Sequence, residues 1–539
     1  MNPLVRFALV CSLAVTLAAQ PVPNTCTDNY WVNSMRCKAV PGQPPQPNWG
    51  SVPTQASHVK TYTRVFVTND TSVRCLDGTW PVIYVDPAVN GPSDKWIFTL
   101  TGGGARHPYD SDGDGLRDAI DIAETYAEAT ERDEMGTALE PPMKSFGGIH
   151  LRDFRNPTFR DYNRVRIEKC GYDRHMGRVS YETAPGTGYF TVTSPAGTPV
   201  SFDLWQHGWL ILEEVLEMLG PGISYTTWRY ENEQIVEDVA SLPPLDEATN
   251  VLFVGHSAAA HGLMHNADRL ASLLPQADVR ALFDANFIPS MENEVGFDST
   301  QLGATAYSGL WTGTTDRAVD PFTYDGSTYH LTMSFISDQY FTYGALNAGL
   351  DQSCVDTHSN VDPLLDTTWK CRDRHHVLLN HISTPYFIRE DFTDDNKEHL
   401  YQGLAHTIQW GQKAAYSHCS PAGSLCLPQL DPTEYRDRLN AQVDALIFQS
   451  SADSELATGA DPSMPAGSVF PTVHIWMPDC GKHEGAYDTA QFLNTTMTYR
   501  TYTYSMRTWL EGFMTLGREN FKSWYVDQMV YDGDLMTTQ

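Results

Sequence analysis

One serine in this chain lies in the sequence surroundings of a catalytic nucleophile. Ser257 is the third residue of the segment 255–259 (GHSAA), which follows an apolar run over 251–254 and precedes a stretch with helical periodicity. The nucleophile-elbow motif G-x-S-x-G places its serine at such a strand-to-helix turn, where Oγ is exposed at the carboxyl edge of the sheet. The tight turn needs small neighbours, and Gly255 and Ala258 meet that need. The alternative is an ordinary turn whose serine only caps the helix.

A nucleophilic serine needs a base and an acid that orients the base. In α/β-hydrolases the acid and then the histidine follow the serine, each after a strand. Asp391, Asp394 and Asp395 follow a predicted strand over 384–388. His483 follows the next predicted strand along the chain. The chain therefore has a histidine and several candidate acids in the required order.

Ester hydrolysis also needs backbone N–H groups that bind the negative oxygen of the tetrahedral intermediate. A run of three glycines at 102–104 directly follows a predicted strand over 96–100. A glycine loop after an early strand can bring its N–H groups close to the serine, which makes it a candidate oxyanion hole. The alternative is a plain loop.

These residues must be positioned by alternating strands and helices. Short apolar runs predict buried strands, and apolar residues at helical spacing predict helices between them. The strands are expected over 81–85, 96–101, 165–167, 251–254, 279–283, 384–388 and 473–476, and the helices over 209–219, 258–274, 400–413 and 435–448. Such alternation favours an α/β fold with a mostly parallel sheet. Without an internal repeat or a low-complexity linker, we expect one domain over 61–539 with large insertions, after an irregular Pro-rich lead-in over 20–60.

The chain resembles the pectin acetylesterase and Notum family of secreted serine carboxylesterases. The resemblance runs from about residue 95 to 487 in five blocks that keep the family's order. They are the elbow 255–260 (family G-x-S-A-G-G), the oxyanion loop 100–104 (L-E-G-G), the spacing set by Asn156, Asn163, Val165, Ile167, Cys170, Asp173 and Gly177, the strand 384–388 with Asp394, and the C-x-x-H of Cys480 and His483. Ala259 and Ala260 depart from the pattern, since the family has glycines there.

The resemblance implies an α/β-hydrolase-like fold and a role for each matched residue. Ser257 is the nucleophile, His483 the base and Asp394 the acid, with Asp391 in reserve. The oxyanion donors are the N–H groups of Gly103, Gly104 and Ala258, and the segment from Asp284 to Asn286 lines the substrate pocket. Catalysis of this kind requires no cofactor.

A second motif predicts a structural calcium ion. The segment 110–121 contains a D-x-D-x-D-G run with an acid at its twelfth position. Alternating carboxylates around a turn-forming glycine can surround one hard cation, which takes six to eight oxygen ligands. The expected ligands are Asp110, Asp112 and Asp114, the carbonyl of Leu116, and Asp121. The alternative is a solvated acidic loop.

Other metal-ligand patterns are weak. His261 and His265 are four residues apart on a predicted helix, a zinc-ligand spacing, but no H-E-x-x-H glutamate accompanies them. We therefore interpret the pair as structural, and the histidines of 374–376 (RHH) carry an equally weak signal. No C-x-x-C pair is present, which disfavours a zinc ribbon.

The charge excludes one class of partner. Lys and Arg number 36 against 66 Asp and Glu, a formal net charge of −30. A polyanion repels phosphate backbones, so we expect no nucleic-acid partner.

The N-terminus and the cysteines predict secretion. Residues 1–19 place Arg6 before an apolar run over 7–19 and end in small residues, as a signal peptide does. That run is shorter than the ~18 residues of a membrane span, so no membrane span is expected. Cleavage there leaves nine cysteines, an odd number that allows several disulfides in an extracellular or periplasmic location. Close pairs such as Cys26–Cys37 and Cys419–Cys426 are candidate local bridges.

Three functions remain open at this stage. The first is a secreted serine esterase that removes acyl groups, acetyl above all, from an extracellular polysaccharide. The second keeps the same triad for a lipid-type acyl ester, as in Notum-type deacylation. The third is a non-enzymatic, calcium-dependent extracellular binding protein.

Overall fold

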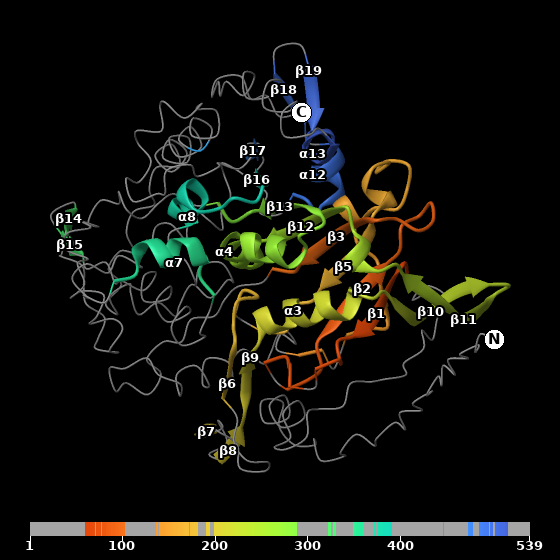
Figure 1. The fold of residues 1–539 in the computed structure, drawn as a ribbon, viewed down its shortest axis with the longest axis horizontal. Helices are drawn as coiled ribbons and strands as arrows, with labels where there is room; N and C mark the ends of the chain where they lie inside the picture. The colour runs from red at the N-terminus through yellow and green to blue at the C-terminus, as the bar shows by residue number, and fades with distance from the viewer. Residues whose placement is uncertain are drawn as a thin grey trace, which may run out of the picture.

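The computed structural model describes residues 60–70, 72–76, 78–102, 136–137, 140–171, 173–181, 190–193, 199–287, 322–324, 327–329, 349–360, 371, 374–390, 446, 473–477, 485–494, 496–499 and 502–515. Figure 1 shows the arrangement of their helices and strands. The expected signal peptide, nearly all of the lead-in 20–60, the helix over 400–413 and most of the helix over 435–448 lie outside these residues.

A nine-stranded sheet forms the centre of the fold, with strand order β17-β16-β13-β12-β3-β5-β2-β1-β4 (Figure 1). The strands are β1 (Tyr62–Phe66), β2 (Val82–Asp86), β3 (Lys95–Leu100), β4 (Met143–Lys144), β5 (Asn163–Ile167), β12 (Asn250–His256), β13 (Asp278–Asp284), β16 (Tyr386–Arg389) and β17 (Val473–Trp476). Every neighbouring pair from β17 to β5 is parallel. The pairs β5–β2, β2–β1 and β1–β4 are antiparallel. The mostly parallel sheet that the sequence predicts is confirmed.

The strand order reverses at β3, which is a topological switch point of the sheet. The chain passes from β3 to β5 on one side, and later to β12 on the other side of β3. In open α/β sheets, ligands bind outside the carboxyl ends of the strands at such a switch point. Here those ends are aligned, because Leu100 pairs with Gly255, and Gly255 with Phe283. The segments that follow β3, β12 and β13 therefore begin side by side.

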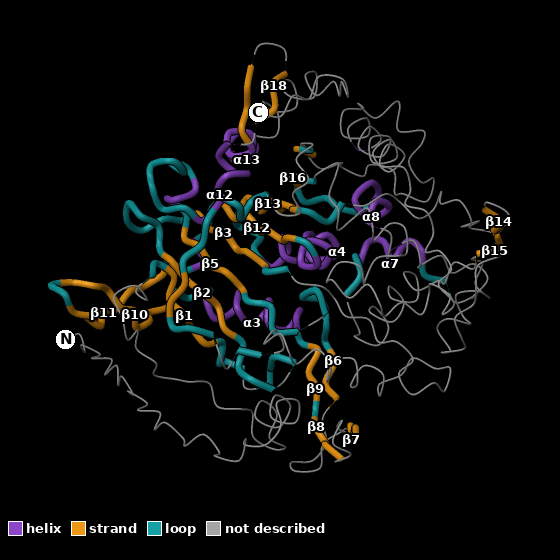
Figure 2. Tube along the Cα trace, turned by 180° about the vertical axis from the view of Figure 1, so that it is seen from behind, coloured by secondary structure: helices purple, strands orange, loops and turns teal. Residues whose placement is uncertain are grey.

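Helices cover both faces of the sheet, as the alternation of side chains along each strand requires. One core contains Phe98 and Phe253 from the strands with residues of α3 (Gly208–Leu219), α4 (Ala258–Leu273) and α8 (Arg374–Asn380). The other contains Leu252 and neighbouring strand residues with α12 (Thr489–Asn494) and α13 (Met506–Thr515). Figure 2 shows α3 and α4 on one side of the strands and α12 and α13 on the other. The result is a three-layer α/β/α arrangement.

Several smaller elements surround the sheet. They are β6 (Val179–Tyr181), β7 (Phe190–Thr193), β8 (Pro199–Phe202), β9 (Leu204–Gln206), β10 (Ile223–Glu231), β11 (Gln234–Leu242), β14 (Phe322–Tyr324), β15 (Ser327–Tyr329), β18 (Thr496–Tyr499), β19 (Tyr502–Ser505), α7 (Gln352–His358) and the short 3-10 turns η3 (Gly148–His150), η4 (Phe159–Asp161) and η5 (Leu245–Glu247). The β10–β11 hairpin projects from the sheet and is largely exposed. Of the described helices, none is long and apolar enough to cross a membrane.

Two disulfides connect described segments. Cys75 bonds Cys170, which follows β5, and Cys354 of α7 bonds Cys371 just before α8. The pairs suggested by close spacing, Cys26–Cys37 and Cys419–Cys426, lie outside the described residues.

Candidate active site

Ser257 occupies the sharp turn between β12 and α4 that the sequence predicts. Its φ of 50° and ψ of −127° are unusual for a residue with a side chain. Such strain persists where the surrounding structure enforces it, and it is concentrated at functional sites. Gly255 is required for the turn, because a Cβ there would lie 2.8 Å from the carbonyl oxygen of Ala259. Ala258, the first residue of α4, is buried directly beside the serine.

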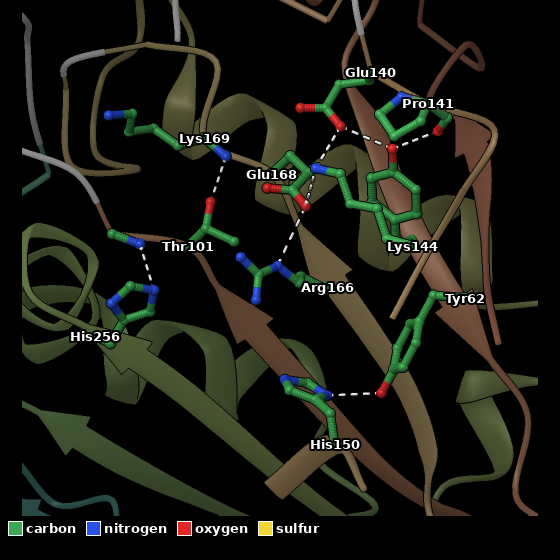
Figure 3. Close-up of polar contacts among 12 residues, drawn as sticks. Tyr62, Thr101, Glu140, Pro141, Lys144, His150, Arg166, Glu168, Lys169 and His256 are labelled. Carbon is green, nitrogen blue, oxygen red and sulfur yellow. Dashed lines mark hydrogen bonds and ion pairs between the residues drawn. The ribbon is translucent and has the colours of Figure 1, made fainter. Parts of the chain in front are cut away.

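The backbone that leads into the glycine run is fixed on all sides. The N–H of Thr101 donates to the carbonyl of Ile167 at 3.1 Å, and its Oγ1 accepts from the N–H of Lys169 at 2.6 Å. The carbonyl of Thr101 accepts from His175 Nε2 at 3.0 Å. Figure 3 shows Thr101 beside Lys169 at the end of its strand. The start of the predicted oxyanion loop is therefore rigid, whereas Gly103 and Gly104 themselves lie outside the described residues.

His256 connects this loop to the serine turn. Its Nε2 accepts the N–H of Gly102 at 3.0 Å, so the ring proton of the neutral imidazole is on Nδ1 (Figure 3). The ring also packs edge-on against Tyr487, with centroids 4.1 Å apart. Sequence reasoning did not single out this residue, although it is the variable position of the G-x-S motif. It holds the oxyanion loop against the strand that carries Ser257.

Burial supports the neutral form of His175. The imidazole is enclosed, and desolvation lowers its pKa. Its backbone N–H donates to Asp173 Oδ1 at 3.1 Å, and the other oxygen of Asp173 accepts from the first N–H of α3 at 2.6 Å. Asp173 belongs to the spacing pattern of the sequence, and its observed role is to fix the segment that holds Thr101.

Asp284 links the serine turn to the segment that follows His483. Its carbonyl accepts the N–H of Ser257 at 2.8 Å. Its fully buried carboxylate accepts from the N–H groups of Ala486 at 2.8 Å and Gly485 at 3.2 Å. Arg389 Nη1 lies 3.5 Å from Oδ1. Burial raises the pKa of Asp284, and the guanidinium and the two N–H groups act in the opposite direction.

The predicted pocket residues Asp284 and Asn286 have protein partners in the described part of the chain. Asp284 binds backbone, as above, and the carbonyl of Asn286 accepts from Arg374 Nη1 at 3.1 Å, with its side-chain Oδ1 also bonded to that guanidinium. Their contact with substrate stays a prediction.

The predicted acid and base lie outside the described residues, but residues close to each of them in the sequence are described. Glu390 ends the segment after β16, and its N–H donates to the carbonyl of Trp476 at 3.1 Å. Asp394 is four positions after Glu390 in the sequence, and His483 is two positions before Gly485. At no more than ~3.6 Å per residue, two steps of chain from Gly485 to His483 span at most about 7 Å. Asp391 and Asp395 are also outside the described part.

Replacing Gly102 by alanine is expected to lower kcat about 10²–10³-fold, the usual effect of losing one oxyanion donor. A Cβ at this position would lie 2.8 Å from His256 Nδ1 and would overlap the His256 carbonyl oxygen, so the loop must move. Steady-state kinetics on a soluble ester measures the effect. Gly171→Ala is the control, because its Cβ would meet nothing closer than 3.6 Å. Full kcat in Gly102→Ala would mean that this loop supplies no donor.

Of the metal-ligand patterns in the sequence, the structure describes the His261–His265 pair and not the predicted calcium segment. All the expected calcium ligands, Asp110, Asp112, Asp114, Leu116 and Asp121, lie outside the described residues. His261 Nδ1 contacts Arg174 Nη1 at 2.8 Å, and its ring lies 5.1 Å from that of His265. Within the described part of the chain, this pair belongs to no group of three possible ligands.

Comparisons with known proteins give the following matches. Residues 54–193 match the sequence model of the pectinacetylesterase family. The palmitoleoyl-protein carboxylesterase NOTUM of Schmidtea mediterranea is 26% identical over 223 residues, which are 41% of this chain and 33% of that protein. The chain thus spans about a third of the length of this relative. Two crystal forms of the Wnt deacylase Notum from Drosophila align with TM-scores of 0.48 and 0.45 at 16% identity, covering 84% and 80% of this chain and 93% and 87% of those chains.

Proposed function

We propose that this chain, which matches the pectinacetylesterase family model over residues 54–193 and is similar to a NOTUM carboxylesterase, is a secreted serine carboxylesterase. One observation carries the proposal most directly. Asp284 binds the backbone N–H of Ser257 and the backbone N–H groups two and three positions after His483 at the same time. A serine on a strained turn, with a histidine segment fastened beside it, is the arrangement that acyl transfer needs.

In the proposed reaction His483 takes the proton from Ser257 Oγ as the oxygen attacks the ester carbonyl. The N–H groups of Gly103, Gly104 and Ala258 bind the resulting oxyanion, and Asp394 orients the imidazole and stabilises its charge. Collapse of the intermediate breaks the ester bond, and His483 gives its proton to the leaving alcohol. Water then attacks the acyl-enzyme, with His483 as base, and releases the carboxylic acid and the free serine. No step needs a cofactor.

We propose an acylated extracellular polysaccharide as the substrate and acetyl as the acyl group. The family whose sequence model matches residues 54–193 is named for pectin acetylesterase activity. The second candidate is a longer, lipid-type acyl ester, which the name of the curated NOTUM relative favours. The non-enzymatic binding protein is the weaker proposal, because the strained Ser257 turn would then serve no purpose.

Location outside the cytoplasm is part of the proposal. The disulfides Cys75–Cys170 and Cys354–Cys371 suit an oxidising compartment. The expected signal peptide over 1–19 and the acidic composition agree with the same location.

Hydrolysis of p-nitrophenyl esters of increasing acyl length tests the proposal. An esterase of acetyl groups is expected to have its highest kcat/KM with acetate, and a lipid-type deacylase with a long chain. A fluorophosphonate should label Ser257 covalently, detected by mass spectrometry of the peptide that contains it. Labelling at another serine, or no hydrolysis of any ester, would refute the assignment.

We further propose that the segment 110–121 binds one structural calcium ion through Asp110, Asp112, Asp114, Leu116 and Asp121. An ion that binds only the folded chain raises its stability in proportion to the logarithm of free ion over Kd. Calcium added to chelator-treated protein is therefore expected to raise Tm, and Asp112→Asn to remove most of that rise. Differential scanning calorimetry measures both. A Tm indifferent to calcium would show that the segment is a solvated acidic loop.

A further inference from the structure

Three buried histidines from α7 and α8 meet at one point of the fold, away from the serine. The histidine cluster consists of His358, the last residue of α7, His376 in α8, and His381 directly after α8. Their ring centroids form a nearly equilateral triangle with sides of 5.0, 5.4 and 5.2 Å. One ligand atom from each lies within 4.8 Å of the others and of Cys354 Sγ. We propose that the histidine cluster binds one Zn²⁺ ion.

The geometry suits this ion. His376 Nε2 and His358 Nε2 are 3.0 Å apart. Two nitrogens at the usual Zn–N distance of ~2.0–2.1 Å in a tetrahedron are about 3.3 Å from each other. Binding therefore needs a movement of only a few tenths of an ångström between these rings. Imidazole is a preferred ligand of zinc, and three histidines with one open position make a recognised zinc coordination set.

His381 already has the partner that a metal-bound histidine needs. Ser353 Oγ donates to Asp351 Oδ1 at 2.7 Å and lies 3.2 Å from His381 Nδ1. Since the hydroxyl proton goes to the carboxylate, the oxygen accepts from the Nδ1–H of His381. The lone pair of that imidazole is then on Nε2, ready for a cation. Carboxylate or hydroxyl partners of this kind orient histidine ligands and raise their basicity.

Asn380 provides a similar partner for His376. Its side-chain Nδ2 lies 3.2 Å from His376 Nδ1 and donates to the carbonyl of His376 at 3.0 Å. Coordination through Nε2 requires the proton of His376 on Nδ1, so the Asn380 amide must rotate to present its oxygen to that N–H, and it gives up its bond to the carbonyl. The hydrogen bond between His376 and His358 is then replaced by two bonds to the metal.

The fourth position of the site goes to water. Cys354 is bonded to Cys371, so its sulfur is not a thiolate and is a poor ligand. The disulfide instead connects α7 to Cys371, just before α8. These two helices carry His358 and His376. The disulfide thus pre-organises the cluster without entering the coordination shell.

A pocket of about 640 Å³ lies beside the residues that support the cluster. Residues 349–353 line it together with the second half of α4, and its lining includes both Asp351 and Ser353. The segment that follows His381 is tied to Asp268 of α4 through the N–H groups of Ser383 and Thr384, which separates the proposed site from the serine turn at the start of that helix. Asp268 is ten residues beyond Ala258 on α4, roughly 15 Å along the helix.

The test uses the full chain with its disulfides intact. After removal of metals by a chelator and dialysis, Co²⁺ is titrated as a visible probe and then displaced by Zn²⁺. We expect one Zn²⁺ per chain and cobalt d–d bands of a tetrahedral nitrogen and oxygen site, without a thiolate charge-transfer band. Absence of tight one-to-one binding, or a thiolate band, would overturn the proposal. None of these signals depends on esterase activity, so the result stands apart from the proposed function.

Variants locate the bound ion. His376→Gln is expected to abolish stoichiometric Zn²⁺ binding, and Ser353→Ala to weaken it about 10–100-fold, the usual loss with an outer partner. The matched control is His375→Gln, an equally buried neighbour on α8 whose ring faces Phe287. Should His376→Gln fail to fold, Ser353→Ala carries the test. Unchanged affinity in Ser353→Ala, or equal loss in His375→Gln, would refute the site.

Discussion

Replacing Ser257 by alanine is expected to lower kcat for ester hydrolysis by at least ~10⁴-fold, and by up to ~10⁶-fold if the triad acts as a unit. The acyl-enzyme cannot form without Oγ, and the remaining oxyanion donors and binding contacts give only residual rate. KM should change little, because Oγ does not hold the substrate in the ground state. Stopped-flow or steady-state hydrolysis of p-nitrophenyl acetate measures both constants.

Ser272→Ala is the matched control for this experiment. Ser272 lies near the other end of the same helix, is exposed, and bonds only the carbonyl of Arg269 among its described contacts. It should retain full kcat and an unchanged Tm. If Ser257→Ala hydrolyses the ester as fast as the Ser272 variant, Ser257 is not the nucleophile.

The sequence predicted the central strands and helices well, because their signals are local. The apolar run 251–254 lies within β12 (Asn250–His256), and the helix expected over 258–274 is α4 (Ala258–Leu273). A parallel strand buried on both faces has a continuous apolar sequence, which is easily recognised. The β10–β11 hairpin was missed for the opposite reason. It is mostly exposed, and its turn at Asn232 and Glu233 uses positive φ without a glycine.

The strand order and the contacts around Ser257 could not be predicted in the same way. No local pattern places β3 between β5 and β12, although that order brings the glycine loop beside the serine. Asp284 was assigned to the substrate pocket by resemblance, whereas its carboxylate binds backbone about two hundred residues away. His256 carries no sequence signature and the histidine cluster only the weak one of His376 in 374–376, because their partners come from distant segments. Such contacts depend on tertiary packing.

Replacing Asp394 by asparagine is expected to lower kcat about 10⁴-fold, the loss seen when a triad acid keeps its shape but loses its charge. The amide stabilises the wrong tautomer of His483 and cannot stabilise the imidazolium that forms as Ser257 loses its proton. The reserve acid, Asp391, gives the matched variant Asp391→Asn. Asp391 directly follows Glu390, whose buried carboxylate accepts the N–H of Phe287 at 2.7 Å.

The two variants separate the candidates because only the residue that acts as the acid stabilises the imidazolium of His483. Glu390 is anchored to the N–H of Phe287 and to the carbonyl of Trp476, and Asp391 is the next residue in the sequence. Asp394 comes three positions later in the sequence and is the residue that matches the acid of the family pattern. The pH dependence of kcat provides a second readout, since a lost acid lowers the pKa of His483 and shifts the acid limb to lower pH. A 10⁴-fold loss in Asp391→Asn with a normal Asp394→Asn enzyme would exchange the two roles.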